Sequence, residues 1–289
     1  MVTIAQFSDT HFAEPGHRSH SGFGYDTDLA WERVFAQGFS GAHAIDSVVV
    51  TGDLADHGEP HEYVRAFEAL GEIPVPTNVL AGNHDFDQPL RDAAATTNIG
   101  TERELIVGPW QYLFVDSNGD VGDTTGRIES DPHLGAWEIV WLDEAIAATN
   151  ADHVWLWMHH PPAAHDTWAH SPKLDTQVTE LIGRHPTIRG IGAGHVHTDL
   201  ERSIADRPVI MCPALTICID FVNFTTRAPG WRLWTFNDDG TFTSECHRAD
   251  ADDQAWPEFD LPQPIIDQQL GKITWDEAAD YMAQLAAFV

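Results

Sequence analysis

The chain has 289 residues, of which 43% are hydrophobic and 21% are charged, and this composition excludes an intrinsically disordered protein. Its 45 acidic residues outnumber its 15 basic ones and give a net charge of −30. Binding to a nucleic-acid polymer through a basic surface is therefore disfavoured, because such binding depends on neutralising phosphates with lysine and arginine. An acidic surface with so few lysines suggests adaptation to a salty cytoplasm, where ions screen the repulsion.

No stretch of about 20 apolar residues occurs, and the first residues lack the basic and apolar segments of a signal peptide. We therefore expect a soluble cytoplasmic protein that does not bind a membrane. Cys212, Cys218 and Cys246 are too few for a disulfide framework and lack the spacing of a zinc site. We expect free thiols, although a bridge between Cys212 and Cys218 stays open.

Short apolar runs alternate with helical patterns along the first two thirds of the chain. The runs are continuous rather than alternating, which predicts strands buried on both faces, at 2–7, 46–51, 77–81, 154–158 and 189–193. Helices are predicted over 26–39, 59–70, 133–149 and 171–186, several of them with capping residues or a proline at the start. This alternation of strand and helix predicts an α/β fold.

Two further regions have the pattern of antiparallel strands, so the sheets are expected to be mixed. Residues 103–117 contain a Gly-Pro turn between two runs, and the region 208–248 contains the turn sequence Asp238, Asp239, Gly240. Residues 251–289 form an acidic C-terminal extension that ends in a predicted amphipathic helix over 274–289. That helix packs either on the body or on a second subunit, and we favour a homodimer.

Polar side chains of the types that bind metals follow each of the five predicted buried strands. They are Asp9 and His11, Asp53 and Asp56, Asn83, His84 and Asp85, His159 and His160, and His195 and His197. One such strand end would indicate only a polar turn. Because the carboxyl ends of strands in an α/β sheet meet at one edge, five of them predict a common site.

The donors in this set are too numerous for one ion. Seven are metal-ligand candidates: Asp9, His11, Asp53, Asn83, His159, His195 and His197. Carboxylate, amide and imidazole ligands without a thiolate suit manganese, iron or zinc. With Asp53 as a bridge, each of two divalent ions has four protein ligands and open positions, which is typical of a catalytic centre.

The motifs D-x-H, G-D-x-x-D, G-N-H-D, H-H-P-P and G-H-x-H, in this order, resemble those of the calcineurin-like metallophosphoesterases. The segments `TGDLADHGEPHEY`, `AGNHD` and `MHHPP` are most similar to the bacterial class III cyclic-nucleotide phosphodiesterase branch. The resemblance spans residues 3–248. It implies a catalytic domain over 1–250 with a four-layer α/β/β/α sandwich of two mixed sheets and a dinuclear metal site at the C-terminal edge of the strands.

The resemblance also assigns the ligands. It implies that one ion is held by Asp9, His11, Asp53 and His197, and the other by Asp53, Asn83, His159 and His195. His159 rather than His160 is the ligand, since the family ligand lies two residues before the first proline of the motif. The ions would be manganese, iron or zinc, or a mixed iron and manganese pair.

For the reaction, the resemblance implies attack on phosphorus by a hydroxide held between the ions. We expect His84 to be the general acid that protonates the leaving alkoxide, or a donor to the phosphoryl oxygen, with Asp85 orienting its ring. We expect Asp56 and His160 to support the ligands. The expected substrate is a 3',5'-cyclic nucleotide. Glycerophosphodiesters, other small diesters and phosphomonoesters remain as alternatives, and a non-catalytic metal-binding scaffold is disfavoured by the complete donor set.

Overall fold

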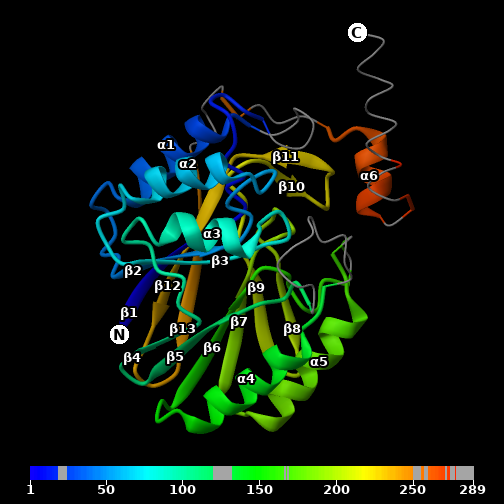
Figure 1. Ribbon diagram of the computed structural model, residues 1–289. Helices are drawn as coiled ribbons and strands as arrows, with labels where there is room; N and C mark the ends of the chain where they lie inside the picture. The colour runs from blue at the N-terminus through cyan, green and yellow to red at the C-terminus, as the bar shows by residue number, and fades with distance from the viewer. Residues whose placement is uncertain are drawn as a thin grey trace.

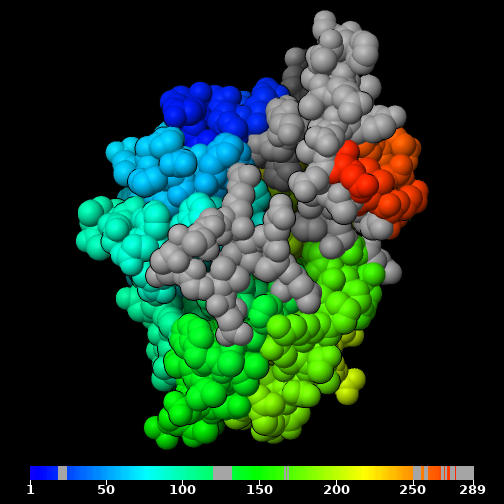
Figure 2. All heavy atoms as spheres, turned by 45° about the vertical axis from the view of Figure 1, so that its right-hand side comes forward, coloured from blue at the N-terminus to red at the C-terminus, as the bar shows by residue number. Residues whose placement is uncertain are grey.

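Two β-sheets pack face to face in the computed structural model, and helices cover both outer faces (Figure 1). The structure describes residues 1–18, 25–119, 132–165, 167, 169–249, 255–256, 260–270, 272–273 and 277. In Figure 2 the blue atoms from the start of the chain and the green atoms from its middle lie at opposite ends of the molecule. The predicted four-layer sandwich is therefore confirmed.

The first sheet has five strands in the order β13-β12-β1-β2-β3. Its strands are β1 (Val2–Phe7), β2 (Ser47–Thr51), β3 (Thr77–Leu80), β12 (Gly230–Phe236) and β13 (Phe242–Arg248). The first three are parallel, whereas β12 is antiparallel to β1 and to β13. This sheet is mixed, as predicted.

The second sheet has six strands in the order β4-β5-β6-β7-β9-β8. They are β4 (Glu104–Val107), β5 (Trp110–Val115), β6 (His153–Met158), β7 (Ile188–Ala193), β8 (Glu201–Ile204) and β9 (Arg207–Met211). The four central strands are parallel and the two edge strands are antiparallel to their neighbours. A separate hairpin is formed by β10 (Cys218–Asp220) and β11 (Thr225–Arg227).

Five of the six helices in the described part of the chain divide between the two outer faces. They are α1 (Thr27–Gly38), α2 (Pro60–Leu70), α3 (Asp87–Ala94), α4 (Ala136–Ala148), α5 (Pro172–Arg184) and α6 (Gln263–Gln269). Side chains of α1 to α3 share a core with the first sheet, and those of α4 and α5 share a core with the second. The four helices predicted between residues 26 and 186 are present, whereas α3 and α6 were not predicted.

Capping residues account for where two of these helices begin. The Asp26 carboxylate accepts a hydrogen bond from Leu29 N–H at 3.0 Å and so caps the start of α1. Ser171 caps α5 by accepting from Leu174 N–H at 3.2 Å, with Pro172 as the first helical residue. Both starts follow from short-range signals in the sequence.

The continuous apolar runs are strands whose two faces enter different cores. In β6, Val154, Leu156 and Met158 pack with α4 and α5. The alternate residues Trp155 and Trp157 fill the space between the two sheets. Because side chains alternate along a strand, a run that is apolar at every position serves both cores.

Two glycines of β7 make room for the tryptophans of β6. A Cβ atom at Gly192 would lie 2.2 Å from Cζ3 of Trp157, and one at Gly190 would lie 2.5 Å from Cζ3 of Trp155. These separations are far below van der Waals contact. The indole rings therefore pack directly against the β7 backbone.

Other predictions about the chain have mixed outcomes. All three cysteines are free, so Cys212 and Cys218 are not bridged. None of the helices in the described part of the chain has the length and apolar character needed to cross a bilayer. The predicted helix over 274–289 lies outside the described residues except for position 277. The division at residue 250, the homodimer and the cytoplasmic location stay predictions.

A buried acid couples α4 to the second sheet. The Glu138 carboxylate is 1% exposed, accepts hydrogen bonds from the Arg103 guanidinium and from Asp116 N–H, and is therefore held in place. Arg103 in turn lies 3.6 Å from the ring centre of Trp141. Burial raises the pKa of Glu138 to about 7, although the charge of Arg103 opposes this rise.

We expect this acid to make stability depend on pH. The folded state holds a proton on Glu138 between pH 4.5 and about 7, a range in which the unfolded chain has lost it. The stabilising effect of that proton is complete below pH 4.5 and is lost as the pH rises through about 7. The wild-type free energy of unfolding, relative to that of Glu138→Gln, should therefore fall over this range by up to about 3 kcal/mol.

Urea denaturation of both proteins across the range measures this difference. Glu180→Gln on α5 is the matched control, because that carboxylate is exposed. A difference between wild type and Glu138→Gln that stays constant with pH would contradict the assignment.

Candidate metal centre

The ends of five strands meet at one edge of the two sheets, and most of the predicted site residues that follow them form groups of neighbouring ligand atoms. Backbone hydrogen bonds join neighbouring loops: Asp9 N–H donates to Gly52 C=O and Gly194 N–H donates to His159 C=O, both at 3.0 Å. The two sheets are joined across the site by His195 N–H, which donates to the Asp9 carboxylate at 3.1 Å. Segments from both sheets therefore build one site.

The backbone is left-handed at five of the candidate ligands. Their φ angles are 53° at Asp9, 45° at His11, 51° at Asp53, 71° at His195 and 53° at His197. Such conformations cost about 1 kcal/mol or more for a residue with a side chain. Strained backbone of this kind gathers at functional sites, where the surrounding structure holds it in place.

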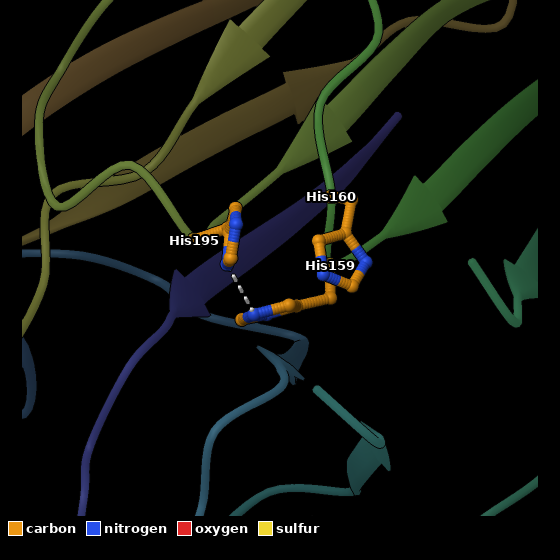
Figure 3. Close-up of side chains that lie close together, drawn as sticks. All are labelled: His159, His160 and His195. Carbon is orange, nitrogen blue, oxygen red and sulfur yellow. Dashed lines mark hydrogen bonds between the residues drawn. The ribbon is translucent and has the colours of Figure 1, made fainter. Parts of the chain in front are cut away.

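The ligand atoms of one half of the site surround His159. Its Nε2 lies 3.0 Å from Asn83 Oδ1, 3.0 Å from His195 Nδ1 and 3.3 Å from Asp53 Oδ2. Figure 3 marks the contact between His195 Nδ1 and His159 Nε2 with a dashed line. Atoms that share an ion at about 2.1 Å lie roughly 3 to 3.5 Å apart, and each of these three distances from His159 Nε2 falls in that range.

The other half of the site is built in the same way around Asp9 and Asp53. His197 Nε2 lies 3.4 Å from Asp9 Oδ1, and His11 Nε2 lies 3.6 Å from Asp53 Oδ2. Ligand atoms of Asp9, His11 and His197 all lie within 4.8 Å of one another, as do those of Asp9, Asp53 and His159. Asp53 Oδ2 therefore lies near an imidazole of each half of the site.

The charges of the buried carboxylates also fit a cation. Burial opposes ionisation of Asp9 and Asp53, yet their pKa values are lowered because the imidazoles of His197 and His159 lie beside them. Within the described residues neither carboxylate pairs with a lysine or arginine. Burial also opposes charge on His159, but Asp53 and Asp9 raise its pKa to about 9. The site therefore demands positive charge, which divalent ions would supply.

Contacts outside the donor set orient three of the imidazoles. His159 Nδ1 donates to Thr51 C=O at 2.8 Å and His197 Nδ1 donates to Ile217 C=O at 3.0 Å. His11 Nδ1 donates to the Asp56 carboxylate at 2.9 Å. Such contacts fix which ring nitrogen faces a metal, and here they turn Nε2 of each ring inward.

The structure corrects the predicted role of Asp85. His84 Nδ1 donates to the backbone C=O of Asp56 at 2.7 Å, so Asp85 does not orient this ring. The buried Asp85 carboxylate instead accepts from the N–H groups of Leu54, Ala55 and Gly82 at 2.9 to 3.1 Å. Burial, and then the nearby charge of Asp53, raise the pKa of Asp85 to about 6. Asp85 ties together the loops that follow β2 and β3.

One contact near the site was missed from the sequence, and it involves Ser117 at the end of β5. His160 Nδ1 lies 2.9 Å from Ser117 Oγ, and its ring centre is 4.3 Å from that of His195. Burial and the charge of His159 hold the pKa of His160 well below its ordinary value, so it is neutral. Ser117 follows the apolar run of β5, and this sixth polar strand end carries the same signal as the other five.

Comparison with known proteins places the chain among phosphoesterases. Residues 2–199 match the family of calcineurin-like phosphoesterases. The chain is 29% identical over 259 residues to the 3',5'-cyclic adenosine monophosphate phosphodiesterase CpdA of Escherichia coli K12, and the match covers 86% of this chain and 90% of that protein. The 3',5'-cyclic-nucleotide phosphodiesterase alr5338 of Nostoc sp. is 24% identical, with 86% and 92% of the two chains covered.

Solved structures share the fold at low identity. GAP50, described as the anchor in the inner membrane complex of Plasmodium, is 12% identical with a TM-score of 0.56, and 98% of this chain and 94% of that chain are covered. Phosphopantetheinyl hydrolase from Mycobacterium tuberculosis is also 12% identical, with a TM-score of 0.50 and coverage of 74% and 90%. The resemblance that the motifs indicated is confirmed: this chain belongs to the calcineurin-like phosphoesterase family of metal-dependent hydrolases.

Proposed function

We propose that this protein hydrolyses a small phosphodiester, with 3',5'-cyclic nucleotides as the first candidates. The observation that carries the proposal is the convergence of seven ligand-type side chains from five strand ends onto one buried centre. The choice of substrate is supported by the names of relatives that match 86% of the chain.

The donor atoms suggest two ions that share one carboxylate. We assign Asp9, His11, Asp53 and His197 to one ion, and Asp53, Asn83, His159 and His195 to the other. When bound, two divalent ions stabilise the charge that develops on the phosphoryl group and lower the pKa of water. Asn83 contributes a neutral oxygen, so the centre keeps a net positive charge that attracts an anionic substrate.

His84 is placed to handle the proton of the leaving group. Its backbone N–H donates to Asp53 Oδ1 at 2.9 Å, which fixes the residue beside the metal centre. A carbonyl only accepts, so the contact with Asp56 C=O places a proton on Nδ1 of His84. In the imidazolium form this half-buried ring carries a second proton on Nε2, and we assign to that proton the protonation of the departing alkoxide, which leaves the neutral imidazole.

Hydrolysis of two diesters tests the function directly. Purified protein with added manganese should hydrolyse both cyclic AMP and bis(p-nitrophenyl) phosphate, and Asn83→Ala should lose both activities because it removes a donor that lies 3.0 Å from His159. Asn150→Ala, at an exposed position after α4, is the matched control and should retain both.

The outcomes separate the remaining alternatives. Turnover of the p-nitrophenyl diester alone would replace the cyclic nucleotide by a glycerophosphodiester or another small diester. Turnover of neither, with two metals bound, would overturn the proposal in favour of a phosphomonoesterase or a binding scaffold.

A further inference from the structure

A second group of metal-ligand side chains shares no residue with the centre described above and comes from the segment after β6 and the first turn of α5. His165 Nδ1 and His170 Nε2 are 3.0 Å apart. Asp175 Oδ2, in the first turn of α5, lies 3.2 Å from His170 Nε2 and 3.6 Å from His165 Nδ1. These three atoms form a compact triangle that the proposed reaction does not use.

We propose that His165, His170 and Asp175 bind a third divalent metal ion of the zinc, cobalt or nickel type. The separations within the triangle, 3.0 to 3.6 Å, are the same as those between donors of the catalytic centre. They are the distances expected of atoms that share one ion. This inference does not rest on the proposed function.

The carboxylate is oriented before any ion binds. Asp175 Oδ1 accepts a hydrogen bond from Ala163 N–H at 2.6 Å, so Oδ2 is left to face the two imidazoles. His170 N–H also donates to Thr167 C=O at 3.4 Å, which restrains the backbone of this ligand. A chelating site built in this way loses little conformational freedom on binding.

The donor types select the kind of ion. Two imidazole nitrogens and one carboxylate oxygen suit borderline transition ions, whereas calcium and magnesium prefer oxygen ligands alone. The side chains of His165, His170 and Asp175 are 60%, 32% and 16% exposed, so an ion can enter from solvent. Three protein ligands leave positions for water, and the net charge of −30 raises the local concentration of cations.

An ion at this position would tie the segment after His160 to the start of α5. Without one, the same three groups could form only a hydrogen-bonded chain. A simple pair elsewhere provides the comparison. Asp143 Oδ1 on α4 lies 2.6 Å from His185 Nε2, and among the described residues no second imidazole joins this pair as a third donor. Both arrangements contain an imidazole beside a carboxylate, but only the first adds a second imidazole that allows the group to chelate an ion.

The test is a count of bound metal. Wild-type protein and the variants His165→Ala, His170→Ala and Asp175→Asn are dialysed to equilibrium against buffered Zn²⁺, and zinc is measured by mass spectrometry. Each variant should hold one ion per chain fewer than wild type. Asp175→Asn is the conservative variant, because its amide oxygen can still accept from Ala163 N–H. Asp143→Asn should bind as many ions as wild type.

Titration with Co²⁺ gives a second measurement that does not depend on turnover. A visible absorption band from the third ion should appear in wild type and be missing in His170→Ala, which circular dichroism should show to be folded. Equal metal counts in wild type and all three variants would overturn the proposal, as would an equal loss in Asp143→Asn. Failure of the catalytic assignment would be seen in a different variant: Asn83→Ala would keep its activity. Its content of the third ion should equal that of wild type in either case.

Discussion

Asp53→Asn is expected to lower kcat/KM for a cyclic nucleotide by ~10³-fold or more and to reduce the number of bound metals. The Asp53 carboxylate lies 3.3 Å from His159 Nε2 and 3.6 Å from His11 Nε2, so it is the acid that faces both halves of the centre. Asparagine removes its charge and replaces one oxygen by an amide N–H group, which cannot bind a cation. Removal of one group that stabilises the transition state electrostatically typically lowers the rate by about 10²- to 10³-fold. Because a bridging ligand holds two ions, its loss should lower the rate by at least the upper value.

Steady-state kinetics and elemental analysis of the same samples measure this effect. The control is Asp46→Asn, which alters an exposed carboxylate near the opposite end of β2 that accepts from Thr3 N–H at 2.7 Å. Its activity and metal content should equal those of wild type. Full metal content with normal turnover in Asp53→Asn would contradict the bridging role.

His84→Ala is expected to lower turnover of cyclic AMP by ~10²- to 10⁴-fold, the usual contribution of a positioned proton donor. The alkoxide that leaves a cyclic nucleotide is strongly basic and needs a proton as the bond to phosphorus breaks. The p-nitrophenolate that leaves bis(p-nitrophenyl) phosphate is weakly basic and needs none. The loss should therefore be much smaller for the p-nitrophenyl diester.

Metal content separates this role from another one that the geometry allows. Ligand-type atoms of His84, His11 and Asp53 lie within 4.8 Å of one another, so His84 could itself bind an ion. Full metal content in His84→Ala supports the proton donor, and loss of an ion would contradict it. His61→Ala is the control, since His61 on α2 is exposed and contacts Glu14 at 3.1 Å. An equal loss on both substrates would show that His84 acts on the phosphoryl oxygen and not on the leaving group.

Much of the fold could be predicted because its signals are local. The continuous run that became β6 is buried on both faces, so every position is apolar, and Ser171 with Pro172 marks the start of α5. The helix α3 was missed because it has only eight residues and buries only Leu90 and Ala94. So short a helix shows no clear apolar period.

The meeting of the site residues could be predicted, but their contacts could not. The rule that strand ends share one edge brings Asp9, Asn83 and His195 together whatever the loops do. The partner of Asp85 depends on how two loops approach, and three backbone N–H groups outcompete the neighbouring His84 for its carboxylate. Which oxygen or nitrogen lies nearest is decided by tertiary packing, which no spacing in the sequence records.

The fit of the two indoles against β7 also limits how this protein can change by mutation. Gly192 has no space for a methyl group while Trp157 occupies its place, and Gly190 stands in the same relation to Trp155. A larger residue at either glycine can be accommodated only if the tryptophan that packs on it becomes smaller. The glycine and the tryptophan of each pair are therefore expected to change together. Trp157 stands two positions before His159, and Gly192 stands three before His195. Homologous proteins that keep both pairs also keep the position of β6 relative to β7. The distance between His159 and His195, which follow these strands, is then kept as well.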